Sequence, residues 1–177
     1  SEVLAIDRKA KLVKVVNLKT GEEYSESYDK LLLSPGAEPV KPPIPGIEDE
    51  AILTLRNVPD TDRIKDYLKD HKVEKAVVVG GGFIGLEMAE NLHQLGLAVT
   101  IVEMADQVMA PLDFEMAAEV HQHLKDKRVG LLLNDAVAAF KREAGGLVVQ
   151  MQSGKTLQAD LVILSIGVRP DSKLAAD

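Results

Sequence analysis

Residues 76–103 read AVVVGGGFIGLEMAENLHQLGLAVTIVE, and this stretch decides the fold. It begins with a short apolar run at 76–79, which is typical of a strand buried on both faces of a sheet. Residues 83–95 then carry apolar side chains at helical spacing, and Gly96 is a suitable helix end. A second apolar run at 98–102 predicts another buried strand. The stretch therefore predicts a strand–helix–strand unit of a parallel sheet.

The turn between the first strand and the helix has the pattern Gly80-x-Gly82-x-x-Gly85. We expect Gly80 to allow a tight turn, Gly82 to let a pyrophosphate approach the backbone, and Gly85 to let the helix lie against the sheet. The free N–H groups of Phe83, Ile84 and Gly85 would point at that anion. This context favours a dinucleotide-binding loop over a turn that is merely tight.

An acidic residue, Glu103, stands at the end of the second strand, 18 residues after Gly85. Such a carboxylate can accept hydrogen bonds from both hydroxyls of an adenine ribose, and it would repel a 2′-phosphate. No basic residue follows it closely, so the pattern favours NAD(H) over NADP(H). FAD also fits a glycine loop with an acid, so the fingerprint alone leaves FAD open. Otherwise Glu103 is a solvated charge at a strand end.

The composition excludes several kinds of site. The 177 residues carry a net charge of −7, which argues against a nucleic-acid partner. There is no cysteine, so disulfides, thiolate metal sites and thiol nucleophiles are excluded within this chain. His121 and His123 point to different faces of a helix, and no metal site is predicted. No apolar run reaches the length of a membrane span, and no membrane partner is expected.

The remaining sequence predicts two groups of elements around a connector. Residues 34–50, SPGAEPVKPPIPGIEDE, hold five prolines and two glycines, which predicts an extended connector without regular structure and a domain boundary within 35–50. Asp60, after a proline, is the expected cap of the first helix after the connector. Short strands are expected at 2–7, 11–18, 22–28 and 31–33, helices at 57–71 and 113–127, a strand at 129–133, an antiparallel meander at 136–143, 146–152 and 155–158, and a buried strand within 159–167.

Three segments together carry a family resemblance: SPGAEPVKPPIPG, the glycine stretch at 76–103, and the tail ILSIGVRPDSKLA. In this order they resemble the FAD-dependent pyridine nucleotide-disulfide oxidoreductases, and most closely the branch of NADH oxidases and coenzyme A-disulfide or persulfide reductases. The resemblance implies an α/β fold: a Rossmann-like, three-layer NAD(P)-binding domain with a parallel sheet and an antiparallel β-meander, flanked by a partial FAD-domain β segment. The implied domains are 1–45 for that segment and the proline-rich crossover, 46–165 for the NAD(H) domain, and 166–177 for a return toward the FAD domain.

The resemblance also implies what the longer protein contains. Its FAD fingerprint and catalytic cysteine would precede Ser1, and its remaining flavin-binding and dimerisation parts would follow Asp177. The first residues lack an initiator Met and a signal-peptide pattern, so a fragment of a longer protein is expected. The resemblance implies that this longer protein is a cytoplasmic homodimer. This chain would bind NADH but supply no catalytic residue. The longer enzyme would pass a hydride from NADH to FAD, with a CoA-type disulfide, a persulfide or oxygen as the open alternatives for the acceptor.

Three further residues acquire roles from the resemblance. Phe83 would gate the nicotinamide pocket, Glu87 would face the nicotinamide amide, and Gly167 would lie at the ligand edge of the sheet. Each has a simpler explanation. Phe83 would pack between helix and sheet, Glu87 would be an exposed helix carboxylate near the positive end of the dipole, and Gly167 would be a turn glycine.

A function of another class also remains, a free-standing NAD(H)-binding redox sensor or regulatory module. An upstream fingerprint and cysteine in the parent gene would exclude that sensor.

Overall fold

The computed structural model describes residues 1–176 and divides the chain into two compact units. The larger unit is Pro39–Val168, and the smaller unit combines Ser1–Glu38 with Arg169–Asp177. Both divisions fall within short paired strands, β4 (Ala37–Pro39) and β13 (Val168–Pro170).

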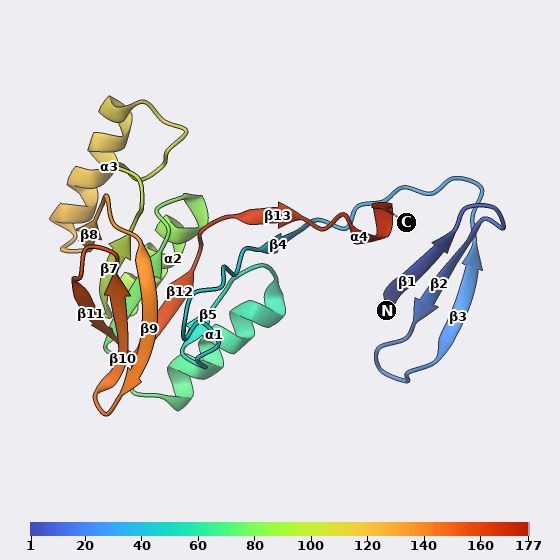
Figure 1. The fold of residues 1–177 in the computed structure, drawn as a ribbon, viewed down its shortest axis with the longest axis horizontal. Helices are drawn as coiled ribbons and strands as arrows, with labels where there is room; N and C mark the ends of the chain where they lie inside the picture. The colour runs from blue at the N-terminus through green and yellow to red at the C-terminus, as the bar shows by residue number, and fades with distance from the viewer. Residues whose placement is uncertain (177) are drawn as a thin grey trace. The chain divides into compact units, whose positions relative to one another are not determined.

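A five-stranded parallel sheet forms the centre of the larger unit, in the order β5-β12-β6-β7-β8 (Figure 1). The central strand β6 pairs with β12 on one side, Val79 opposite Leu164, and with β7 on the other, Val79 opposite Val102. All four side chains of β12 are buried, as a strand covered on both faces requires. The strands are β5 (Ile52–Leu53), β6 (Lys75–Val79), β7 (Ala98–Val102), β8 (Gly130–Leu132) and β12 (Leu161–Leu164).

The two faces of this sheet pack against different layers. On one face, Ile101 and Ile163 lie in a cluster with residues of three helices, α1 (Val58–Asp70), α2 (Phe83–Gln94) and α3 (Phe114–Asp126). On the other face, Val79 and Leu164 pack against the antiparallel meander of β9 (Val137–Glu143), β10 (Gly146–Met151) and β11 (Thr156–Ala159). The predicted three-layer α/β class is therefore confirmed.

The smaller unit contains an antiparallel sheet in the order β1-β2-β3 and the short helix α4 (Lys173–Ala176). Its strands, β1 (Glu2–Asp7), β2 (Leu12–Val16) and β3 (Glu23–Ser27), agree with the predicted ranges to within two residues. Val15 is the buried apolar residue of this sheet. The run at 31–33 is not the predicted strand, and Leu32 is 88% exposed. Hydrophobicity alone does not make a strand where no neighbouring strand supplies the ladder.

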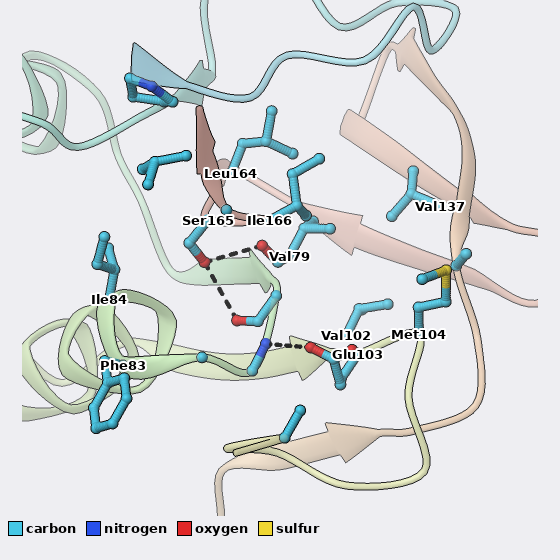
Figure 2. A pocket seen from close by; sticks show the side chains of 18 of the residues that line it. Val79, Phe83, Ile84, Val102, Glu103, Met104, Val137, Leu164, Ser165 and Ile166 are labelled. Carbon is cyan, nitrogen blue, oxygen red and sulfur yellow. Dashed lines mark hydrogen bonds between the residues drawn. The ribbon is translucent and has the colours of Figure 1, made fainter. Parts of the chain in front are cut away.

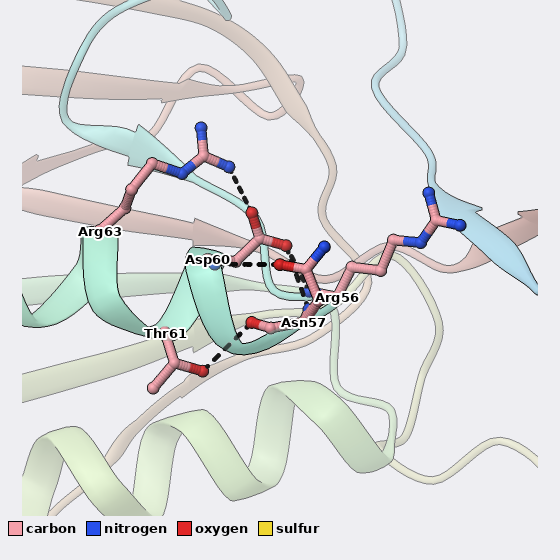
Figure 3. A network of polar contacts seen from close by, with 5 residues as sticks. All are labelled: Arg56, Asn57, Asp60, Thr61 and Arg63. Carbon is pink, nitrogen blue, oxygen red and sulfur yellow. Dashed lines mark hydrogen bonds and ion pairs between the residues drawn. The ribbon is translucent and has the colours of Figure 1, made fainter. Parts of the chain in front are cut away.

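Two other local predictions need correction. The proline-rich connector does contain an element, because β4 pairs with β13; Pro39 is tolerated there because a two-stranded ladder leaves edges that need no N–H donor. The N-cap of α1 is Asn57, not Asp60. Asn57 accepts from the Asp60 N–H, and the Asp60 carboxylate accepts from the Asn57 N–H, so Asp60 is the third residue of a capping box (Figure 3).

Candidate functional site

A cavity of about 600 Å³ lies at the carboxyl edge of the parallel sheet, within the larger unit (Figure 2). Its floor is formed where three strands end, at Val79, Val102 and Leu164. The glycine loop at 80–82 and the segment 164–168 after β12 form much of its wall. Parallel α/β sheets bind their ligands at this edge, so the cavity is the candidate site.

Two of the three fingerprint glycines are required by close packing. A Cβ added to Gly80 would lie 2.4 Å from the Ser165 carbonyl oxygen, and Gly80 also has a φ of +108°. A Cβ added to Gly85 would lie 2.0 Å from the Gly80 carbonyl oxygen. Gly85 is buried behind the loop and does not line the cavity. These two positions hold the turn and the helix against the sheet, as the sequence predicts.

Gly82 differs from both, because an added Cβ would meet no atom within 4 Å. Gly82 lines the cavity and is the N-cap of α2, with an extended backbone and no side-chain cap. Protein packing does not require a glycine at this position. The open space in front of it is where the sequence pattern expects a ligand to approach the backbone.

The middle glycine, Gly81, has a role that the sequence pattern did not reveal. Its N–H donates to Glu103 Oε2 at 2.6 Å, and its carbonyl accepts from the Met109 N–H at 2.8 Å. An added Cβ would lie 2.8 Å from Val108 Cγ1. Gly81 is thus fixed on three sides, and the only sequence signal for this was the unbroken run of three glycines.

Glu103 lines the cavity, and its carboxylate is fixed by two backbone donors. Oε2 accepts from Gly81, and Oε1 accepts from the Ala105 N–H at 2.8 Å. A carboxylate has about four acceptor positions, so roughly two remain for hydroxyl donors. The acid therefore orients the glycine loop and still has acceptors for a ribose.

The N-terminus of α2 meets the cavity at Phe83 and Ile84, which are 65% and 40% exposed. The first N–H groups of a helix lack intrahelical partners and carry the positive end of its dipole. Among the described residues that line the cavity, the charged side chains are the carboxylates of Glu103 and Asp135. An anion here would be held by backbone N–H groups rather than by cationic side chains.

Asp135 is 6% exposed and ties the meander to the cavity wall. Its carboxylate accepts from the Ser153 hydroxyl and from the Ser153 N–H, and its own N–H donates to the Glu103 carbonyl. The Ser153 hydroxyl is the main cause that holds the pKa of Asp135 below its ordinary value. Asp135 therefore remains ionised and keeps the turn between β10 and β11 next to the end of β7.

Ser165 and Gly167 follow β12 and line the same cavity. The Ser165 hydroxyl donates to two carbonyl oxygens, that of Val79 at 3.0 Å and that of Gly80 at 3.3 Å (Figure 2). Gly167 has a φ of +113°, and its carbonyl accepts from the Val40 N–H at 3.0 Å. The sequence indicated Gly167 but did not assign Ser165 to the site.

Glu87, like Gly85, is a predicted site residue that the structure does not place in the lining of this cavity. It is exposed, one turn after Phe83, and lines a second, open cavity of about 720 Å³ between α2 and α3. Phe83 borders both cavities. The two residues thus share one face of α2 and line the same second cavity.

The residues of the first cavity fit a dinucleotide. Gly82 leaves the backbone open, a helix N-terminus faces the space, Glu103 keeps free acceptors, and the walls are largely apolar. Among the residues that the structure describes, no three His, Cys, Asp or Glu side chains lie together as metal ligands. None of the described helices has the length and apolarity needed to cross a bilayer.

Known proteins are similar to this chain in sequence and fold. A coenzyme A disulfide reductase of Staphylococcus aureus (strain JH9) is 36% identical over 173 residues, which cover 98% of this chain and 38% of that protein. The crystal structure of reduced Bacillus anthracis CoADR-RHD matches with a TM-score of 0.94 and 52% identity, covering 99% of this chain and 31% of that one. The water-forming NADH oxidase from Lactobacillus brevis, bound to NADH, matches with a TM-score of 0.89 and 33% identity over 99% of this chain and 38% of that one.

The chain thus spans about two fifths or less of the length of these relatives. The family model described as pyridine nucleotide-disulphide oxidoreductase matches residues 1–177. The order of elements, the glycine loop and the match along the whole sequence agree. This chain belongs to the pyridine nucleotide-disulphide oxidoreductase family.

Proposed function

We propose that this chain binds NAD(H), as part of a longer flavoprotein that passes a hydride from NADH to FAD. The observation that carries the proposal is the combination of three features in one cavity: the unobstructed Gly82, the N-terminus of α2, and the fixed carboxylate of Glu103. The NADH-bound relative from Lactobacillus brevis supports it.

Each part of the cavity has a proposed task. The pyrophosphate would lie against Gly82 and the N–H groups of Phe83, Ile84 and Gly85, where the helix dipole favours negative charge. The adenine ribose would donate its hydroxyls to Glu103. Phe83 and Ile84 would contact the nicotinamide side of the coenzyme, and Glu87 would accept from its amide. The apolar walls would exclude water from this edge, and Gly167 would lie beside the coenzyme there.

The charge of the site favours NADH over NADPH. A ribose 2′-phosphate would stand next to the Glu103 carboxylate, and the described lining of the cavity offers no cationic side chain to compensate. The Glu103 side chain cannot easily turn away, because two backbone N–H groups hold it. The two hydrogen bonds that fix Glu103 beside the glycine loop would thus also favour NADH over NADPH.

The bound coenzyme would supply a hydride, and this chain would supply binding and orientation. The chain contains no cysteine, so a sulfur acceptor would be reduced by other parts of the protein. We propose a CoA-type disulfide or persulfide, or oxygen, as the final acceptor. We further propose that residues 46–165 are the NAD(H) domain, that 1–45 and 166–177 belong to the FAD side, and that the full protein is a cytoplasmic homodimer.

Calorimetric titration of this chain with NADH, NADPH and FAD, each at the same salt concentration, tests the proposal. We expect NADH to bind at least about tenfold more tightly than NADPH, and no uptake of FAD. Binding of FAD in place of NADH would mean that the glycine loop serves the flavin. Binding of none of the three would contradict the proposal for this chain.

A further inference from the structure

His121 belongs to α3, and its contact with the loop that follows β7 was not expected from the sequence. Its Nε2 lies 3.1 Å from the backbone nitrogen of Val108. A backbone N–H can only donate, so Nε2 must accept, and the proton of the neutral ring must be on Nδ1. The Phe114 ring packs edge-on against the imidazole, with centroids 6.3 Å apart. The contact therefore requires an uncharged imidazole in one tautomer.

Val108 lies directly against the glycine loop. Its side chain is fully buried, and Val108 Cγ1 occupies the space in which a side chain at position 81 would stand. The next residue, Met109, donates its N–H to the Gly81 carbonyl and has a φ of +53°, a left-handed conformation that a non-glycine residue adopts at some cost. Met104, Ala110 and Pro111 of the same loop line the cavity.

These contacts form one continuous series. His121 fixes Val108, Val108 and Met109 fix Gly81, and Gly81 fixes the carboxylate of Glu103. A buried N–H without a partner is costly, so loss of the His121 acceptor would displace Val108 from its place against Gly81.

We propose that His121 is a positioning residue for the dinucleotide site, and that its neutral imidazole holds the loop 104–112 against Gly81 in the geometry that binds NAD(H). This proposal rests on the proposed function. Protonation would turn Nε2 into a donor facing the Val108 N–H, and the hydrogen bond would be lost. Coenzyme affinity would then fall as the pH decreases, because a protonated ring cannot accept the Val108 N–H.

The other charged groups near the ring do not replace this contact. The loop contributes Asp106 and Asp113, and α3 contributes Lys125 one turn further along. Within the described part of the chain, none of the three forms an ion pair or hydrogen bond with His121. The imidazole is therefore the group whose charge decides the Val108 contact.

Two variants separate the acceptor from the charge. His121→Gln places an amide oxygen near the position of Nε2 and does not titrate. His121→Leu removes the acceptor. NADH affinity is measured between pH 6 and pH 8, with His71→Gln as the control, since His71 is bonded to a backbone carbonyl at the end of α1, far along the chain from the loop. The amide resonances of Val108 and Met109 are followed over the same pH range without coenzyme.

We expect the wild-type affinity to fall at least about threefold from pH 8 to pH 6, the Gln variant to bind well without that fall, and the Leu variant to bind about tenfold more weakly throughout. The His71 control should follow the wild type. A pH-independent Val108 amide, or a Leu variant with full affinity, would overturn the proposal. If the wild type binds no NADH, the proposed function fails, and the Val108 amide still decides whether His121 holds the loop.

Discussion

At each end of the parallel sheet, one carboxylate accepts hydrogen bonds from two backbone N–H groups, but the two carboxylates lie in different surroundings. At the amino end, the Asp160 carboxylate accepts from the N–H groups of Glu74 and Lys75, each at 2.9 Å. At the carboxyl end, Glu103 accepts from Gly81 and Ala105. Each acid fixes a neighbouring segment through two backbone donors.

Only the second of these acids lines the 600 Å³ cavity. A carboxylate held by backbone donors is thus a structural clasp in both places. It becomes a candidate ligand group where strand ends, a glycine loop and a helix N-terminus leave space beside it. Matched substitutions at the two ends can separate stability from binding.

The largest effect is expected from Gly85→Ala, because its Cβ would overlap the Gly80 carbonyl oxygen at 2.0 Å. We expect a loss of about 3 kcal/mol in the free energy of unfolding, together with loss of NADH binding. The matched change at the amino end, Gly96→Ala, meets open space but has a φ of +88° and should cost about 1–2 kcal/mol without affecting binding.

Urea unfolding followed by circular dichroism measures both variants, which suits a chain without tryptophan. Equal losses for the two glycines would mean that the carboxyl end is no more tightly packed than the amino end.

The second pair of substitutions replaces each of the two acids by the corresponding amide. Glu103→Gln and Asp160→Asn each weaken two charge-assisted hydrogen bonds, so we expect similar losses of about 1–2 kcal/mol in unfolding free energy. Only Glu103→Gln should lower the affinity for NADH, by about tenfold. It should also reduce the ratio between the affinities for NADH and NADPH. Calorimetry with both coenzymes measures this. A Glu103→Gln variant with unchanged affinity would make Glu103 a clasp like Asp160.

The third pair lies at the two ends of α2, where Phe83 is 65% exposed and Leu95 is 67% exposed. Truncation of either to Ala should change the unfolding free energy by less than about 0.5 kcal/mol, since both are surface positions. Phe83→Ala should weaken NADH binding about threefold by removing ring contact. Leu95→Ala should leave NADH binding unchanged. If both substitutions changed the NADH affinity equally, Phe83 would not be part of the binding site.

The smallest effect on NADH binding is expected at Asp60, an acid beyond the carboxyl end of β5 that does not line the cavity. Burial is the largest single cause and raises the pKa of its carboxyl. The hydrogen bonds from Arg63 and from the N–H groups of Arg56 and Asn57 together lower the pKa by more than burial raises it. The pKa of Asp60 therefore lies below its ordinary value (Figure 3).

A carboxyl with a lowered folded-state pKa adds stability above its unfolded pKa of about 3.9, and this stability is lost as the pH falls through the folded value. Asp60→Asn should cost about 1 kcal/mol at pH 7 and less at pH 3, with unchanged NADH affinity. Urea unfolding at both pH values tests this, and a cost that is equal at both would exclude the charge of Asp60 as its cause.

Much of the larger unit could be predicted because its signals are local. Continuous apolar runs indicated β6 and β7, helical spacing indicated α2, and the glycines with Glu103 indicated the carboxyl-edge site. The pairing of β4 with β13 could not be predicted, because it joins segments about 130 residues apart and each of them ends in a proline, Pro39 or Pro170. The capping of α1 was assigned to the wrong member of an Asn57–Asp60 pair, since either residue type can cap.

The sequence by itself determined the strand–helix–strand unit, its glycine loop and the acid at its end, because backbone conformation and strand burial depend on residues that are neighbours in the chain. Only the tertiary structure decided that Gly81 joins Glu103 to the loop at 104–112, that His121 holds that loop, and that Glu87 faces a different cavity from Glu103. These relations depend on which segments meet across the sheet edge, and a hydrogen bond between distant residues leaves no periodic pattern in the sequence.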